Sequence, residues 1–477
     1  MKTFNLILYA ALLGTGLLTA CTMGPNYLKP TVQVPVTFKE QQGWKIAQPQ
    51  DERPRGKWWE SFGDAKLNQL LEQVEVNNQN IKSAEAQYRQ ARALTQQSEA
   101  AYYPTVTGGV SATRSRPASN SSNLTNYDPN INNAYRLNVG ASWEPDLWGS
   151  IKRSVEAGNA STQASAGNLA AAKLSAQAQL AQNYFLLRIA DANAKLYADT
   201  VADYEKSLQL TKNQYAVGVV AKADVVVAET QLKSTKAQAI DVGVQRAKLE
   251  HAIAILIGKA PAEFSIEPAI TALVTLPPAI PLGVPSQLLE RRPDIAAAER
   301  QTASANAKIG VAKAAFFPSL TLSTTAGLQS TSFAQWLTYP ARYWSLGPAL
   351  AETIFDGGLR KAQTAQAEAV YDQDVAIYRQ TVLGAFQEVE DNLAALRILE
   401  EEATIQDDAV KSAKESVKIT NNQYKAGVVN YLNVINAETA ALSNERAALA
   451  IQSNRLTAAV LLITALGGGW DADALNH

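Results

Sequence analysis

The feature that most constrains this chain is an internal duplication. The segment Asn-Gln-Tyr-Ala-Val-Gly-Val-Val that begins at Asn213 recurs 209 residues later as Asn-Gln-Tyr-Lys-Ala-Gly-Val-Val. Three further pairs follow the same order: Asp224-Val225 through Ala228-Glu229 with Asn433-Val434 through Ala437-Glu438, Ala101–Thr105 with Ala315–Ser319, and Glu144–Gly149 with Glu352–Gly357. Ordered matches of this kind indicate a tandem repeat of about 210 residues. The fold must therefore be one that two similar halves build together.

The repeats predict the organisation of the chain. We expect a signal peptide at 1–20, a lipidated N-terminal segment at 21–63 that wraps an equatorial region, and a C-terminal tail at 471–477. Repeat 1 is predicted at 64–258, repeat 2 at 286–470, and a Pro-rich linker between them at 259–285.

The first 21 residues have the features of a bacterial export signal. Lys2 precedes an apolar run that ends at Leu18, and Thr19-Ala20 stand directly before Cys21. This stretch resembles a lipobox, in which Cys21 is lipidated and becomes the first residue of the mature chain; the alternative is an ordinary signal with a coincidental Cys. Thr22 rather than Asp follows, which favours an outer-membrane address. After the signal, the sequence contains no uninterrupted run of 18 apolar residues, so it predicts no transmembrane helix.

Each repeat predicts the same order of elements. A helix, at about 64–100 or 293–315, ends near Pro104 or Pro318, because the residue before proline is driven to extended geometry. A β-hairpin follows at about 104–148 and 318–355. A very long helix then turns near Gly218 or Gly427 and returns as a second helix. From 358 to 420 there is no Pro and only one Gly, so a continuous helix would be about 95 Å long. Its coiled-coil seam is predicted at Val382, Phe386, Val389, Leu393 and Leu396.

The hairpins alternate between apolar and polar residues. Leu137, Val139, Ala141 and Trp143 fall on one face of a strand, and the residues between them are polar or small. Strands of about ten residues suit an outer membrane, but four are too few to close a barrel, which needs about eight or more. Unpaired strand edges are costly in lipid. Two or more copies of this mixed α and β chain must therefore share one barrel around a polar, water-filled interior.

Composition excludes several classes of function. The charged residues almost balance, with 43 Lys plus Arg against 44 Asp plus Glu, so we expect no nucleic-acid partner. One Cys and two His cannot build a thiolate or imidazole metal cluster, and signature motifs of hydrolases, zinc proteases, ATPases and dinucleotide enzymes are missing from the sequence. We expect no enzyme activity, no cofactor and no bound metal.

Several motifs together resemble the OprM/NodT branch of the TolC superfamily over essentially the whole mature chain. They are the lipobox, Trp58–Phe62, Tyr103-Pro104, Ser142–Glu144, the two Asn-Gln-Tyr turns, Leu288–Ile295, Ile309–Ala312, Phe317–Ser319 and Ala465–Trp470. The resemblance implies a homotrimer with a 12-stranded transmembrane β-barrel, four strands per chain, continued by a long periplasmic α-helical barrel. It also implies the outer-membrane duct of a tripartite pump for drugs or other small solutes. The partners would be a periplasmic adaptor, an inner-membrane transporter and outer-membrane lipid.

The resemblance also implies a functional site at the two Gly turns. These would form the periplasmic tip that contacts the adaptor, through Tyr215, Gly218, Val219, Val220, Tyr424, Gly427, Val428 and Val429. The alternative is that each turn is only a helix cap. Relatives line the closed gate with acidic residues six or nine positions after the turn Gly. Here those positions hold Asp224 and Val227 in repeat 1 and Asn433 and Asn436 in repeat 2, so the second repeat lacks the carboxylates.

Other residues admit a functional and a structural interpretation. Arg291, Arg292 and Asp294 would suit an anion site, but we expect them to open a helix. Trp58 and Trp59 are interpreted as an anchor of the N-terminal segment, and Trp143, Trp148, Tyr343 and Trp344 as an interfacial girdle. Two alternative functions remain open at this point: the exit duct of a type I secretion system, and a coiled-coil envelope lipoprotein without a pore.

Overall fold

A computed structural model describes residues 22–40, 56–116, 131–269, 277–278, 280 and 285–470. Cys21, the signal peptide, the tail with His477 and parts of the predicted linker lie outside these residues. The chain forms two compact units, one made of Met1–Pro30, Tyr88–Ala164 and Ala298–Tyr378, the other of Thr31–Gln87, Ser165–Ala297 and Arg379–His477. Each unit thus draws segments from both sequence repeats.

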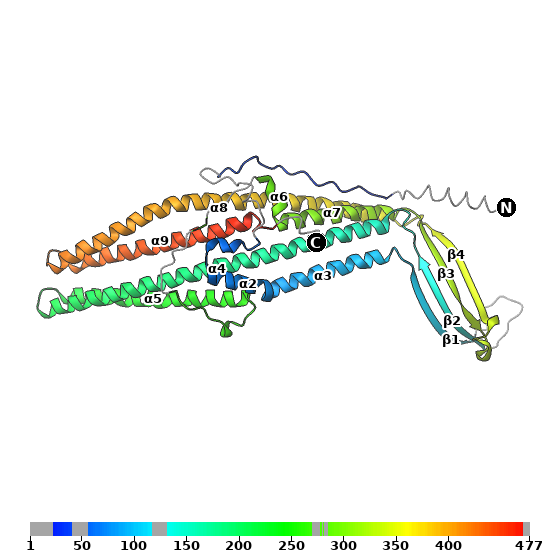
Figure 1. Ribbon diagram of the computed structural model, residues 1–477, viewed down its shortest axis with the longest axis horizontal. Helices are drawn as coiled ribbons and strands as arrows, with labels where there is room; N and C mark the ends of the chain where they lie inside the picture. Colours follow the sequence, from blue (N-terminus) through cyan, green and yellow to red (C-terminus); the bar gives the residue numbers. More distant parts are fainter. Residues whose placement is uncertain are drawn as a thin grey trace. The chain divides into compact units, whose positions relative to one another are not determined.

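The first unit holds one antiparallel sheet of four strands (Figure 1). The strands pair in chain order, β1-β2-β3-β4, so that the two predicted hairpins lie next to each other. Within the described residues, β1 and β4 each pair on one side only. Their bounds are Thr105–Ser115 for β1, Asn132–Trp143 for β2, Ser319–Ser330 for β3 and Arg342–Ala351 for β4.

The strand register separates the two faces of the sheet. Leu137 is opposite Val110 on one side and Leu328 on the other, and Trp143 is opposite Leu322. On the other face, Asn138 lies between Gly109 and Gly327. Because directly paired residues share a face, the predicted alternation extends across all four strands. The sheet has one apolar and one polar surface.

Three helices of repeat 1 have equivalents of the same length in repeat 2. The 67-residue helices are α4 (Ser150–Ala216) and α8 (Leu359–Lys425); the 35-residue helices are α5 (Lys222–Leu256) and α9 (Tyr431–Ala465). The 22-residue helices are α3 (Gln79–Ala100) and α7 (Pro293–Ala314). At 1.5 Å per residue, α4 and α8 each contain about 100 Å of helix. The long helices predicted after each hairpin are confirmed.

The first predicted helix is wrong in one respect, because it breaks in two at Asn78. Helix α2 (Ala65–Asn77) ends there, since Asn78 adopts an extended ψ of 123°. The Asn78 side chain explains the break: its oxygen accepts bonds from the N–H groups of Asn80 and Ile81, at 2.9 and 3.1 Å. Its amide donates to the carbonyl of Leu256 at 2.8 Å. An asparagine that caps the next helix favours a new start over a continuous one.

The core of the second unit lies between these helices. All five residues of the seam predicted on α8 are buried, with Val382, Val389 and Leu393 fully so. A short 3₁₀ helix, η1 (Trp58–Phe62), buries Trp58 and Trp59 of the N-terminal segment. The remaining short elements are η2 (Pro261–Glu263), η3 (Pro285–Gln287), α6 (Leu288–Arg291), η4 (Phe333–Gln335) and η5 (Tyr339–Ala341).

Helix α9 is long and apolar enough, by length and composition alone, to cross a membrane. The sequence expectation excluded such a helix because it counted only uninterrupted apolar runs. Of the most apolar window of α9, 39% is buried inside the protein. Leu456, Val460 and Leu462 are fully buried there, which is typical of a core helix.

Candidate functional site at the helical turns

Two matching turns connect the long helices to their return helices. Gly218 and Gly427 both have positive φ, at 80° and 75°. In the first turn, the N–H of Val219 donates to the carbonyl of Gln214 at 2.9 Å, and in the second the N–H of Val428 donates to Gln423 at the same distance. This pattern is the Schellman motif, which favours glycine because side chains are strained at positive φ. The local geometry of the two copies is therefore the same.

The surroundings of the two turns differ. The Tyr215 side chain is 46% exposed, whereas its equivalent Tyr424 is 3% exposed. The Tyr424 hydroxyl lies 3.2 Å from the hydroxyl of Thr211 on α4. This contact links the α8/α9 hairpin of repeat 2 to the α4/α5 hairpin of repeat 1.

A cluster of buried residues, here called the tip cluster, surrounds that contact. Its aromatic members Tyr424 and Tyr431 have ring centroids 5.4 Å apart. The second valine after each turn glycine, Val220 or Val429, packs against the cluster, whereas the first is exposed. The cluster consists of Tyr204, Leu208, Ala228, Leu232, Tyr424, Tyr431, Val434 and Ile435. It joins the two helical hairpins through apolar burial, the dominant favourable term in packing.

The gate candidates lie at the start of the return helices. Asp224 is in the first turn of α5, and its carboxylate accepts a bond from the N–H of Ala221 at 3.2 Å. In the second copy, the N-cap is Asn430, whose side chain accepts from the N–H of Asn433 at 3.3 Å. Asn433 and Asn436 have exposed side chains. All three candidates therefore lie close after the turns, and Asp224 also has a capping role.

Sequence reasoning noticed Glu438 as a repeat match and missed it as a site. This glutamate on α9 is 8% exposed and lines a groove of about 620 Å³ beside the tip cluster. Ser207 donates to one carboxyl oxygen at 3.3 Å, and among the described residues the other oxygen has no hydrogen-bond partner. Burial, aided by the nearby charge of Asp203, raises the pKa of Glu438 to about 7, and hydrogen bonds from Ser207 and Asn421 oppose that rise. Only the packing of α4 against α9 makes this position unusual.

The duplication also extends to a salt bridge of reversed polarity. In repeat 2, Lys414 of α8 pairs with Glu445 of α9 at 2.8 Å. In repeat 1, the positions 209 residues earlier hold Glu205 and Lys236, which pair at 2.6 Å. Each pair joins the two helices of one hairpin. The hairpins are therefore built on one plan even where their charges differ.

The described residues 22–30 of the N-terminal segment pack closely within the first unit. Arg153 of α4, whose side chain is buried, donates to the carbonyl of Met23 at 3.1 Å and to the Asn26 side chain at 2.9 Å. Gly24, with φ of 86°, packs so closely on Gly310 of α7 that a Cβ would lie 2.4 Å from the Gly310 Cα. The residues that follow Cys21 are thus closely packed against α4 and α7.

The remaining sequence candidates have structural partners. Arg292 donates to Asp294 at 2.7 Å, to Glu388 of α8 at 2.6 Å and to the carbonyl of Ala465 at 3.2 Å. The two carboxylates neutralise the charge of Arg292, which favours the structural interpretation of this residue. Trp58 donates to Gln177 at 3.3 Å. This bond ties the N-terminal segment to α4.

The aromatic residues predicted as a girdle lie in or next to the sheet. Trp143 is on β2, and Tyr343 and Trp344 are on β4. Trp148 follows the hairpin, stacks on Phe317 at 4.7 Å and donates to the carbonyl of Pro318 at 2.7 Å.

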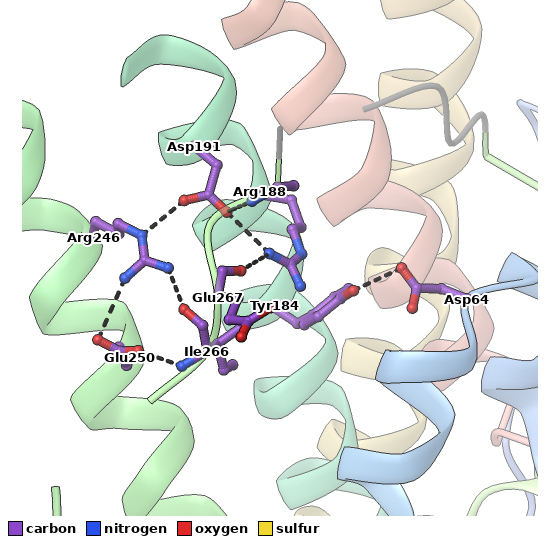
Figure 2. Close-up of polar contacts among 9 residues, drawn as sticks. Asp64, Tyr184, Arg188, Asp191, Arg246, Glu250, Ile266 and Glu267 are labelled. Carbon is purple, nitrogen blue, oxygen red and sulfur yellow. Dashed lines mark hydrogen bonds and ion pairs between the residues drawn. The ribbon is translucent and has the colours of Figure 1, made fainter. Parts of the chain in front are cut away.

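A partly buried polar network holds the segment after α5 against the helices (Figure 2). Arg246 of α5 lies between Asp191 of α4 and Glu250, and it donates to the carbonyl of Ile266. Arg188 bonds to Asp191 and to the carbonyl of Glu267, both at 3.0 Å. The network fixes the start of the predicted linker.

A sheet with one apolar and one polar face, together with paired helices of 67 and 35 residues, is typical of an outer-membrane channel protein. The sequence profile of the family described as outer membrane efflux protein matches residues 70–259 and 284–468. The chain belongs to this family, whose members are outer-membrane channels of efflux pumps.

Known relatives match nearly end to end. The solvent efflux pump outer membrane protein SrpC of Pseudomonas putida is 30% identical, covering 98% of this chain and 99% of its own length. The cation efflux system protein CusC of Escherichia coli is 28% identical, covering 95% and 96%. The solved structure of the outer-membrane channel OprN has a TM-score of 0.88 at 30% identity, covering 94% of this chain and 100% of that one.

Proposed function

We propose that three copies of this chain form a passive duct in the outer membrane, closed by a 12-stranded barrel and continued by a helical barrel in the periplasm. The observation that carries the proposal is the sheet, which has one apolar and one polar face and, in the part of the chain that the structure describes, two edge strands paired on one side only. Four strands are below the number that closes a barrel, and open edges are costly in lipid. Three sheets joined edge to edge remove those edges.

The duct is proposed to carry drugs or other small solutes for a tripartite pump. The helical turns at Gly218 and Gly427 would contact a periplasmic adaptor, and an inner-membrane transporter would supply the energy. Asp224, Asn433 and Asn436 would line the gate. Relatives are named for solvent, toluene and cation efflux, which supports small solutes as cargo.

A lipid on Cys21 is proposed to anchor the chain in the same membrane. The close packing of Met23 and Gly24 supports this proposal, because it fixes the residues next to Cys21 in place. Cys21→Ser is expected to abolish labelling by a radioactive fatty acid; unchanged labelling would refute lipidation.

The test of the duct is planar-bilayer recording on the purified oligomer. We expect discrete conductance steps, together with solute efflux in a pump strain that lacks its own outer-membrane component. A folded oligomer that conducts nothing in the bilayer and restores no efflux would overturn the proposal. It would favour an envelope lipoprotein without a pore.

A further inference from the structure

A cavity of about 500 Å³ lies within the first unit, between helices α3, α4 and α7. Each helix lines it with one face, because the lining residues recur every three or four positions. On α4 they are Ser154, Ala157, Gly158 and Ser161, and Gln363 of α8 lines the cavity as well. Small side chains on these helices leave the space open. Its volume lies in the range that takes a drug-sized molecule.

Two polar side chains of α7 distinguish the cavity from a gap between small residues. Ser304 and Lys308 both line it and are about one helical turn apart. Ser304 is fully buried, and its hydroxyl has no hydrogen-bond partner among the described residues. A helical hydroxyl can donate to the carbonyl four residues earlier, as Thr302 does to Ala298 at 3.0 Å. Leaving the Ser304 hydroxyl unpaired is unfavourable, so the wall of the cavity contains a donor that a ligand can use.

Lys308 supplies a positive charge at the same place. Its side chain is exposed, and in the part of the chain that the structure describes it forms no ion pair. Asp374 of α8 acts on Lys308 through its charge alone: burial raises the pKa of Asp374, and the charge of Lys308 opposes that rise. Lys313 on the same helix differs, because it pairs with Glu368 of α8 at 3.1 Å. Lys308 is therefore the lysine of α7 that can receive an anion.

The surface next to Lys308 is apolar. Leu94 of α3 lines the cavity and is 53% exposed, and Val311 lies about one turn after Lys308 on α7. At the 214-residue offset that relates Ala101 to Ala315, Leu94 and Lys308 occupy equivalent positions of the two repeats. The duplication thus brings an apolar and a cationic side chain to one cavity. An apolar molecule bound there would remove the Leu94 side chain from water.

We propose that this cavity binds an amphipathic carboxylate, with the carboxylate group between Lys308 and Ser304 and the apolar chain along Leu94 and Val311. A carboxylate fits because its two oxygens can accept from an ammonium group and from a hydroxyl at once. One lysine balances its single charge, whereas a phosphate monoester near neutral pH carries closer to two. The apolar walls favour a hydrocarbon chain over a hydrated inorganic anion. The proposal goes beyond the duct, since binding requires no transport.

Binding of radiolabelled decanoate tests the proposal. The purified full-length protein is placed in nanodiscs of phosphatidylcholine, and equilibrium dialysis measures bound against free acid, with empty nanodiscs as background. We expect one saturable site per chain. Lys308→Glu puts a negative charge beside the carboxylate, so it should weaken binding at least about tenfold. Because Lys308 is exposed, this variant should fold normally. The matched control is Lys313→Glu, which changes the same charge on the same helix and should bind decanoate as the natural protein does.

A second variant tests the hydroxyl without changing any charge. Ser304→Ala removes the donor and should weaken binding severalfold, while thermal unfolding shows whether the fold is intact. Decanol and decyl phosphate test the head group, and both should bind more weakly than decanoate. Tighter binding of either would overturn the assignment to a carboxylate.

The site is wrong if the natural protein shows no saturable binding, or if Lys308→Glu binds decanoate as tightly as Lys313→Glu. Conductance of the same protein is recorded separately in planar bilayers. A protein that conducts and binds no decanoate refutes the cavity site and leaves the duct standing. A protein that binds decanoate and conducts nothing refutes the duct and leaves the cavity site standing.

Discussion

The Asp191 carboxylate on α4 lies 2.7 Å from Nε of Arg246 on α5, and both belong to the network that holds the segment around Ile266 (Figure 2). The Asp191 side chain is almost fully buried and also bonds Arg188 and the N–H of Ala269, both at 3.0 Å. Its three interactions join α4, α5 and the segment that follows α5. Removing one charge would leave two arginines without their shared partner.

We therefore expect Asp191→Ala to destabilise the protein strongly. Breaking a buried ion pair from one side costs up to about 3–5 kcal/mol. Arg246 retains its longer pair with Glu250 at 3.4 Å, so we expect a loss toward the lower end of that range. Thermal unfolding of the detergent-purified protein measures the loss. Asp199→Ala is the control on the same helix, since Asp199 forms an exposed pair with Lys195 at 3.0 Å. Exposed pairs contribute about 0–1 kcal/mol, so equal effects of the two substitutions would contradict the assignment.

The turn glycines should resist substitution for a backbone reason. Gly218→Ala and Gly427→Ala place a side chain at φ of 80° and 75°, which costs about 1–2 kcal/mol for residues other than glycine. We expect lower melting temperatures and faster amide exchange at the turns. Gly243→Ala in α5 is the control, because a Cβ there meets no atom within 4 Å and alanine favours helix. A control as destabilising as the turn variants would show that backbone strain is not the cause.

The close packing of Gly24 on Gly310 predicts a different kind of effect. Gly310→Ala would place a Cβ 2.8 Å from both the Arg153 side chain and the Met23 carbonyl. We expect the N-terminal segment to detach from α4 and α7. Limited proteolysis should then cut near Met23 faster, while the helices keep their stability. Gly56→Ala is the control, since no atom lies within 4 Å of its Cβ. Unchanged cleavage of the Gly310 variant would mean that the packing around Gly310 tolerates the extra methyl group.

Much of the fold follows from local pattern and repetition. The seam from Val382 to Leu396 is predicted by its spacing, because helical periodicity alone decides which side chains face a neighbour. The faces of the strands follow from alternation around Leu137 for the same reason. The break at Asn78 escaped prediction, since it depends on a bond from its amide to Leu256, 178 residues away. A partner so distant in the sequence cannot be predicted from local sequence.

The candidate site was harder to predict from the sequence than the fold. The turns at Gly218 and Gly427 are readable because a Schellman motif needs only local residues. The different exposure of Tyr215 and Tyr424 could not be predicted from the sequence, because the two copies are nearly identical there. The difference arises from the packing of one hairpin on the other. Glu438 and Glu229 match in the same way, yet one is buried and the other is paired with Lys212.

That difference between the two glutamates predicts how stability depends on pH. Burial raises the pKa of Glu438 from its ordinary value of 4.5 to about 7. Between these values the folded chain keeps the proton while the unfolded chain loses it, so stability falls as pH rises from about 4.5 to about 7 and then levels off. The full loss is up to about 3 kcal/mol per subunit, at 1.36 kcal/mol for each pKa unit. Melting temperatures recorded from pH 5 to pH 8 measure the slope.

The variant Glu438→Gln keeps the shape of the protonated acid and cannot ionise, so it should flatten that slope and be more stable than the natural protein at pH 8. Glu229→Gln is the matched control from the other repeat. The ion pair with Lys212 lowers the pKa of Glu229, so this carboxylate is already charged throughout the range and its removal should leave the slope intact. If Glu438→Gln melts with the same pH dependence as the natural protein, another group carries the titration, and the buried carboxyl beside the tip cluster is not protonated near neutral pH.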